Sequence, residues 1–132
     1  MIAGLDTSVI VRLLVGLPES QARVAARRVQ ELHDAGATLL VTDIALAETY
    51  HALHQHYGVP KAEARAMLRR FAESGVVSVD PPEVAAVLLP SPGAGLVDRM
   101  IHARHRARGG TTLTFERAQG RLDGAERLRP GR

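Results

Sequence analysis

Four acidic residues stand where a carboxylate could do chemistry: Asp6, Glu48, Asp98 and Glu116. Three of them fall at the end of a predicted strand or in the first turn of a predicted helix, and Glu48 lies on the polar face of a helix. Hard cations such as Mg²⁺ and Mn²⁺ prefer carboxylate oxygens, and they can activate water for phosphodiester hydrolysis. Clustered carboxylates repel each other unless a cation or a shared proton neutralises them, so a cluster of these acids would require a metal ion.

Each of these acids also has a simpler interpretation. Asp6 can cap the helix that follows it, and Asp98 can complement the dipole of its own helix. Glu48 can be a solvated side chain, and Glu116 can pair with a neighbouring arginine. Spacing alone therefore leaves open whether the four acids form one site.

Two carboxylate–histidine pairs offer a different metal site. Glu48 and His51 are three residues apart, and Asp98 and His102 are four apart, so each pair shares one face of its predicted helix. Such pairs could bind a transition metal. Solvated histidines, or a contact between His51 and a substrate phosphate, are the simpler interpretation.

Signatures of several other chemistries are absent from the sequence. There is no G-x-x-x-x-G-K-[ST] and no G-x-G-x-x-G after the first strand, so no motif supplies a phosphate cradle for ATP or a dinucleotide. There is also no G-x-S-x-G elbow and no H-E-x-x-H pair. Ser8 stands where a D-x-D phosphatase would have its second acid. The absence of cysteine excludes disulfides, thiol catalysis and cysteine zinc sites.

Strands and helices are expected to alternate along the chain. Apolar runs predict strands at about 2–5, 37–41, 76–79, 111–114 and 125–128. Helical spacing of apolar residues predicts helices between them, the sixth running from Leu96 to about Arg108. We expect Ser20 to cap the second helix and Thr42 or Asp43 to cap the third. Such βαβ units form a mainly parallel sheet with helices on both faces and place ligands at the carboxyl ends of the strands.

The elements also make predictions about burial. The run 37–41 does not alternate between apolar and polar residues, which indicates a strand covered on both faces. In the third helix an apolar stripe reaches Tyr57, and in the sixth helix it reaches Ala107, with Asp98, His102 and His105 on the other face.

The size and charge of the chain fit one domain with a polyanionic partner. The chain has 132 residues and a formal charge of +3, but nine arginines and only three acids lie from Arg99 onward. A basic end suits a polyanion, although arginine can also simply be the preferred cation, since Lys61 is the only lysine. The longest apolar run falls well short of the roughly 20 residues that span a bilayer, so we expect a cytoplasmic protein.

Four segments resemble, in order, those of PIN-domain ribonucleases of the VapC toxin type. Ile2–Leu14 has the family's opening strand, an Asp-Thr-Ser and an apolar helix, and Val41–Glu48 carries the family's helix glutamate. Val97–Ala103 resembles the family's A-D-x-x-I-A segment, and Thr112–Arg117 resembles its L-T-F-D-R segment. The resemblance covers essentially the whole chain, which implies a single PIN domain over residues 1–132.

The resemblance implies a three-layer α/β/α fold with a mainly parallel sheet of four to five strands. It also implies a Mg²⁺- or Mn²⁺-dependent endoribonuclease that cleaves RNA with metal-activated water, dimerises, and is neutralised by a cognate antitoxin. The family's metal-binding and catalytic acids correspond to Asp6, Glu48, Asp98 and Glu116, and its site-orienting hydroxyls to Ser8 and Thr114. For such an enzyme, Arg99, Arg104, Arg106 and Arg108 are the expected RNA-phosphate contacts.

Two positions depart from the family pattern. Glu116 replaces the usual aspartate and is one methylene longer, which matters to the strict octahedral geometry of Mg²⁺. Gly95 replaces an acid that is often found three residues before Asp98. These departures motivate an alternative hypothesis, in which the protein is a weakly active or inactive PIN domain that binds RNA or a partner.

Overall fold

The structure, a computed structural model, describes residues 1–131 and combines helices with parallel strands. The strands are β1 (Ile2–Gly4), β2 (Thr38–Thr42), β3 (Val77–Asp80), β4 (Thr112–Thr114) and β5 (Ala125–Arg127). The helices are α1 (Thr7–Val15), α2 (Glu19–Asp34), α3 (Asp43–Gln55), α4 (Lys61–Ala72), the 3₁₀ helix η1 (Pro82–Leu88), α5 (Leu96–Ala107) and α6 (Arg117–Gly120). The mixed α/β class is confirmed, and it is consistent with a three-layer α/β/α arrangement.

The five strands are all parallel to their neighbours but form two sheets. One sheet has the order β1-β2-β3, with Ile2 opposite Thr38 and Leu39 opposite Val77. The other sheet contains only β4 and β5, with Thr112 opposite Ala125. The strand number agrees with the expected four to five, but a single chain does not join these strands into one sheet.

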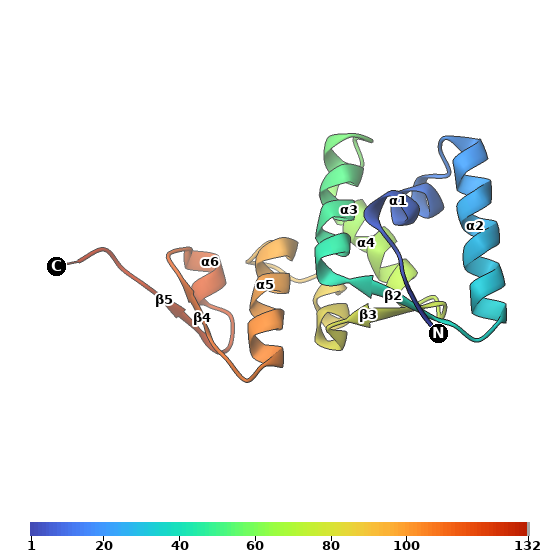
Figure 1. Ribbon diagram of the computed structural model, residues 1–132. Coiled ribbons are helices and arrows are strands. Elements are labelled where there is room, and N and C mark those ends of the chain that lie inside the picture. The colour runs from blue at the N-terminus through green and yellow to red at the C-terminus, as the bar shows by residue number, and fades with distance from the viewer. Residues whose placement is uncertain (132) are drawn as a thin grey trace.

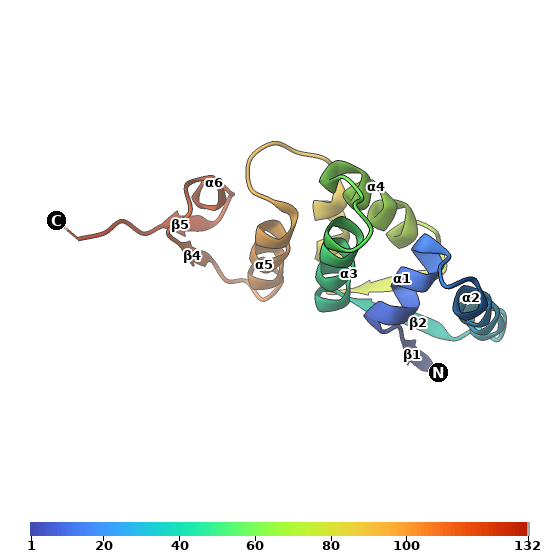
Figure 2. The same cartoon turned by 90° about the horizontal axis from the view of Figure 1, so that it is seen from above.

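The chain has two regions on opposite sides of α5 (Figures 1 and 2). We call residues 1–88 the body; they contain the three-stranded sheet, α1 to α4 and η1. We call residues 112–127 the C-terminal unit; they contain β4, α6 and β5. In both views α5 lies between them, so the C-terminal unit is well separated from β1.

The core of the body lies on one face of its sheet. Leu39 and Val41 of β2 are almost fully buried, whereas Thr38 is exposed and Leu40 is half-buried. Because successive side chains of a strand point to opposite faces, β2 is fully covered on one face only. The expectation of a strand covered on both faces is therefore wrong for the single chain. On the buried face, Leu46 and Leu53 of α3 complete the packing without any exposed surface.

Several predictions of local structure are also corrected. Pro18, not Ser20, is the N-cap of α2, and the apolar stripe of α3 stops short of Tyr57 because that helix ends at Gln55. On α5, Ala107 is exposed and His102 is buried, the reverse of the expected faces. The helix α6 was not predicted, because four residues are too few to show a periodic pattern.

Candidate active site

Asp6 caps α1 and remains open to solvent. Its carboxylate accepts hydrogen bonds from the Ser8 hydroxyl at 2.9 Å and from the Ser8 backbone N–H at 3.3 Å. These bonds, the hydroxyl first, hold the pKa of Asp6 below its ordinary value of 3.8. Asp6 is therefore both a helix cap and an ionised carboxylate at the carboxyl end of β1, oriented by the hydroxyl that the sequence singled out.

Glu48 lies on the exposed side of α3, next to the start of α1. It lines a hollow of about 320 Å³ together with Thr7, His51 and three other residues of the α3 end. Thr7 follows Asp6 directly, so the body brings the elements that carry Asp6 and Glu48 to the same hollow. The Ala45 N–H bonded to Thr42 Oγ1 at 3.2 Å shows that Thr42 is the cap of this helix.

Asp98 and Glu116 are connected on the other side of the molecule through Gln119. The Gln119 side chain donates to the backbone oxygen of Asp98 at 3.0 Å and accepts from the Thr114 hydroxyl at 3.1 Å. That hydroxyl in turn accepts the backbone N–H of Glu116 at 3.0 Å. Thr114 therefore holds the start of the segment that carries Glu116, and Gln119 is a buried residue that no sequence pattern singled out.

The single chain does not gather these acids into a metal site. Among residues 1–131, no three side chains of His, Cys, Asp or Glu lie close enough to hold a metal ion. Asp6 and Glu48 belong to the body, whereas Glu116 belongs to the C-terminal unit and Asp98 to α5, which is bonded to that unit. The four carboxylates are the kind of ligand that Mg²⁺ prefers, but within the described residues of one chain they lie too far apart to bind one ion together.

His102 is occupied by structural hydrogen bonds. Its Nε2 lies 2.7 Å from the Asp123 backbone oxygen, to which it must donate, and its Nδ1 lies 2.6 Å from the Thr112 hydroxyl. The same hydroxyl lies 2.8 Å from Nδ1 of His105. Both ring nitrogens of His102 are therefore engaged, so the transition-metal site suggested by Asp98 and His102 is wrong.

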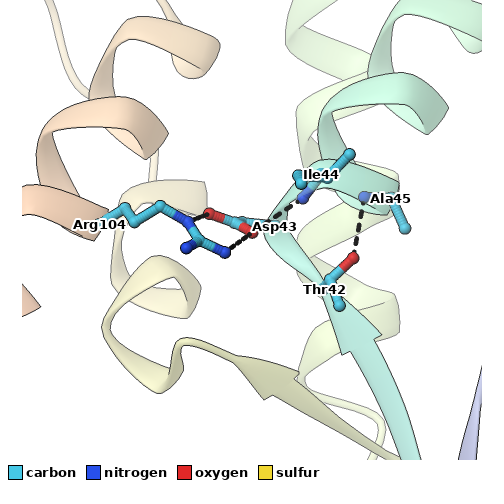
Figure 3. A network of polar contacts seen from close by, with 5 residues as sticks. All are labelled: Thr42, Asp43, Ile44, Ala45 and Arg104. Carbon is cyan, nitrogen blue, oxygen red and sulfur yellow. Dashed lines mark hydrogen bonds and ion pairs between the residues drawn. The ribbon is translucent and has the colours of Figure 1, made fainter.

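An ion pair between Asp43 and Arg104 joins α3 to α5 (Figure 3). Arg104 donates from Nε to Oδ2 at 2.8 Å and from a terminal nitrogen to Oδ1 at 3.1 Å. This bidentate contact lowers the pKa of Asp43, mainly through the hydrogen bond from Arg104, and raises the pKa of Arg104. Because the guanidinium faces Asp43, Arg104 serves first to position α5 against the body.

The other three arginines expected at RNA phosphates lie at the ends of α5. Arg99 donates to the backbone oxygens of Ala94 and Pro92, at 2.8 Å and 2.6 Å, and so orders the loop before the helix. Arg106 donates to the backbone oxygen of Gly110, and Arg108 is exposed beside a hollow that Arg104 also lines. Their contact with RNA stays a prediction.

Comparison with known proteins gives one match. The family model of the PIN domain matches residues 4–125, which include all four acids and both hydroxyls. The chain belongs to the PIN domain family. No curated protein and no solved structure matched the chain.

Membership in the PIN family gives the chain a nuclease fold, of a family that generally uses divalent metal ions. The four acids singled out from the sequence lie within the matched residues. Over the described residues 1–131, no helix is both long enough and apolar enough to cross a bilayer.

Proposed function

We propose that this PIN protein is an endoribonuclease that depends on Mg²⁺ or Mn²⁺. The observation that carries the proposal is the family match over residues 4–125, which encloses Asp6, Glu48, Asp98 and Glu116. These carboxylates are the proposed metal ligands, with Ser8 and Thr114 as orienting hydroxyls. Support also comes from Asp6, a solvent-exposed carboxylate that the Ser8 hydroxyl orients just after β1.

RNA is the proposed substrate because arginines are concentrated in the part of the chain that follows Asp98 and contains Glu116. Nine arginines from Arg99 onward supply positive charge to a region that contains Asp98 and Glu116. Phosphate contacts of this kind hold a nucleic acid in position without reading its bases. Arg108 is the best candidate, since Arg99, Arg104 and Arg106 already donate to groups of the protein.

The proposal extends to a toxin that a cognate antitoxin neutralises. Apolar surface away from β1 suits such a partner: Ile44 of α3 is 63% exposed and Ile101 of α5 is 44% exposed, and both line one hollow. Large exposed apolar side chains commonly mark interaction surfaces. Expression of the protein alone should arrest growth, and co-expression of a small antitoxin encoded beside its gene should relieve the arrest. Growth that is unaffected by the protein would contradict the toxin role.

Cleavage of RNA by the purified protein tests the nuclease activity. Single-stranded RNA and transfer RNA should be cut in the presence of Mn²⁺ or Mg²⁺ and left intact after EDTA. Asp6→Asn and Asp98→Asn should abolish cutting, while Asp34→Asn, at an exposed acid of α2, should not. Cutting that survives EDTA or both site substitutions would overturn the assignment.

A second candidate is a PIN domain that binds RNA or a partner without cleaving it. The separation of the acids in the single chain favours it, as do Glu116 and Gly95, which both depart from the family pattern. In that case RNA should shift in a gel with or without metal, and Glu116→Asp should bind RNA equally without nicking it. Turnover by the wild-type protein would exclude this candidate.

A further inference from the structure

The outer edge of β1 has no strand beside it. β1 pairs with β2 on one side only, and Ile2 is 70% exposed. Beside β1 lies a hollow of about 590 Å³, with residues of β1, α1 and α2 in its lining. Its lining is mainly apolar and includes Ala3, Leu5 and Val9. An unpaired strand edge beside an apolar hollow is a template for another strand.

The C-terminal unit has a small sheet with apolar side chains that nothing in the described residues covers. β4 and β5 form a two-stranded parallel sheet, although parallel sheets are normally buried on both faces and two strands alone are marginally stable. One face of β4 is covered, since Thr112 and Thr114 are buried against polar groups of α5 and α6. On its other face Leu113 is 61% exposed and Phe115 is 65% exposed.

β1 and β4 each end two residues before one of the candidate acids. β1 ends at Gly4, two residues before Asp6, and β4 ends at Thr114, two residues before Glu116. If the strands pair in parallel with Gly4 opposite Thr114, the two acids lie at neighbouring strand ends, about 4.8 Å apart along the sheet. The same register places Leu113 on the face of Ala3 and Phe115 on the face of Leu5, so both apolar side chains enter the hollow.

The same chain could make this pairing, with α5 in its position, only by fully extending the connection before β4. Arg104 binds Asp43 and lines a hollow with Asp80 and Arg108, which places the end of α5 at the carboxyl end of β3. A strand paired with β1 would begin about 17 Å from there, three strand spacings across and three residues back. The connection from Ala107 to Thr112 has five Cα–Cα steps and would reach about 17–18 Å only if fully extended. Instead it begins with a turn, in which the Gly109 and Gly110 N–H groups donate to the backbone oxygens of Arg106 and His105. If α5 moved instead, the buried Leu96 and Met100 would leave the core.

We propose that the free edge of β1 binds β4 of a second copy of this chain, and that the two copies exchange their C-terminal units. The combined sheet then has the order β5-β4-β1-β2-β3, and α5 and α6 of the partner cover the exposed face of β1. Glu116 of the partner subunit then lies beside Asp6 and Glu48. Asp98 of the partner subunit is brought to the same site, because Gln119 donates a hydrogen bond to its backbone oxygen. Such reciprocal exchange closes as a symmetric dimer.

The chemistry of this composite site rests on the proposed function, but the pairing itself does not. Its consequence for the site is specific: each copy supplies two acids to each of two sites, and neither copy has a complete set alone. A dimer is therefore a requirement for metal binding, and loss of the pairing should abolish metal binding without unfolding the body.

Cross-linking tests the pairing without any assay of activity. The natural chain has no cysteine, so one thiol can be placed in each of two chains, Ala3→Cys in one and Leu113→Cys in the other. Co-expressed and treated with a short bismaleimide, this pair should give a covalent dimer on a denaturing gel. Pairing Ala3→Cys with Leu17→Cys, an equally exposed position outside the hollow, should not.

A second variant distinguishes a partner chain from the same chain. Ala3→Cys and Leu113→Cys combined in one chain should again give a covalent dimer, whereas an internally cross-linked monomer would overturn the proposal. Leu113→Asp should convert the dimer to a folded monomer by light scattering, and Leu17→Asp should leave it dimeric. A wild-type protein that is monomeric at micromolar concentration, or the absence of a cross-link with the first pair, would also overturn it. Failure of RNA cleavage alone would reject the proposed function and leave this result standing.

Discussion

The body and the C-terminal unit are stabilised in different ways. Every fully buried apolar residue of residues 1–131 lies at or before Ala103, and the core includes Ile10, Leu46 and Leu53. The buried residues beyond it are all polar: Thr112, Thr114 and Gln119. The body and α5 therefore fold around one apolar core, whereas the C-terminal unit is held to α5 by hydrogen bonds.

This difference explains why Asp6 and Glu48 lie apart from Asp98 and Glu116 in the single chain. Hydrogen bonds contribute about 1 kcal/mol each in net terms, and they orient groups more than they drive folding. Within the unit, Nε of Arg127 is buried and has no hydrogen-bond partner among the described residues. A region with polar buried contacts and exposed Leu113 and Phe115 is stabilised further when an apolar surface covers it. The edge of β1 offers that surface in a second copy.

Removal of a core side chain from the body should have the largest effect on stability. Leu53→Ala deletes a fully buried side chain of α3 and is expected to lower the free energy of unfolding by about 2–5 kcal/mol. Leu113→Ala, at an exposed position of β4, should leave the unfolding of the isolated monomer nearly unchanged. Urea denaturation of both variants at low protein concentration measures this contrast, and equal losses would contradict it.

The ion pair between the body and α5 should have the next largest effect. Asp43→Asn removes a carboxylate that accepts two hydrogen bonds from Arg104, a loss of about 1–2 kcal/mol because the arginine is half-exposed. Since the pKa of Asp43 is lowered in the folded state, its contribution is present above the unfolded value near 3.8 and is lost as the pH falls through the folded value.

The pH dependence of unfolding measures this contribution. The difference in stability between wild type and Asp43→Asn should be constant at neutral pH and shrink in acid, below about pH 4. Asp34→Asn, at an exposed acid of α2, is the matched control. A difference that grows in acid would contradict the assigned role of Arg104.

Loss of Gln119 should loosen the C-terminal unit alone. Gln119→Ala removes the bonds to the Asp98 backbone and the Thr114 hydroxyl, a local loss of about 1 kcal/mol. Hydrogen exchange should accelerate in β4 and β5 and stay unchanged in β2, while Gln55→Ala, on the exposed side of α3, should change neither. Faster exchange throughout the body would show that the two regions unfold together.

An exposed ion pair of the body should have the smallest effect. Glu19 and Arg23 are both more than 70% exposed at their side chains, and their contact of 2.9 Å is open to water. Glu19→Gln should change the free energy of unfolding by less than about 0.5 kcal/mol by urea denaturation. A larger loss would mean that α2 depends on this pair more than its exposure indicates.

The sequence predicts what is local and misses what depends on distant contacts. Parallel strands, helix positions and the cap at Thr42 follow from apolar runs and capping residues, whereas the choice of Asp6 and Glu48 as site residues stays a prediction. The burial of His102 could not be predicted, because its partners Thr112 and Asp123 come from later elements. For the same reason the pattern at residues 37–41, which indicates two covered faces, describes a sheet that a single chain leaves half open.

Mixing two inactive variants tests most directly whether the site is shared between copies. Asp6→Asn and Glu116→Gln each damage every site of their own dimer, but a mixed dimer has one site with both natural acids. After co-expression, RNA cleavage with Mn²⁺ should return to about a quarter of the wild-type rate, because half of the dimers are mixed and one of their two sites is intact. A mixture as inactive as either variant, beside an active wild type, would contradict the shared site.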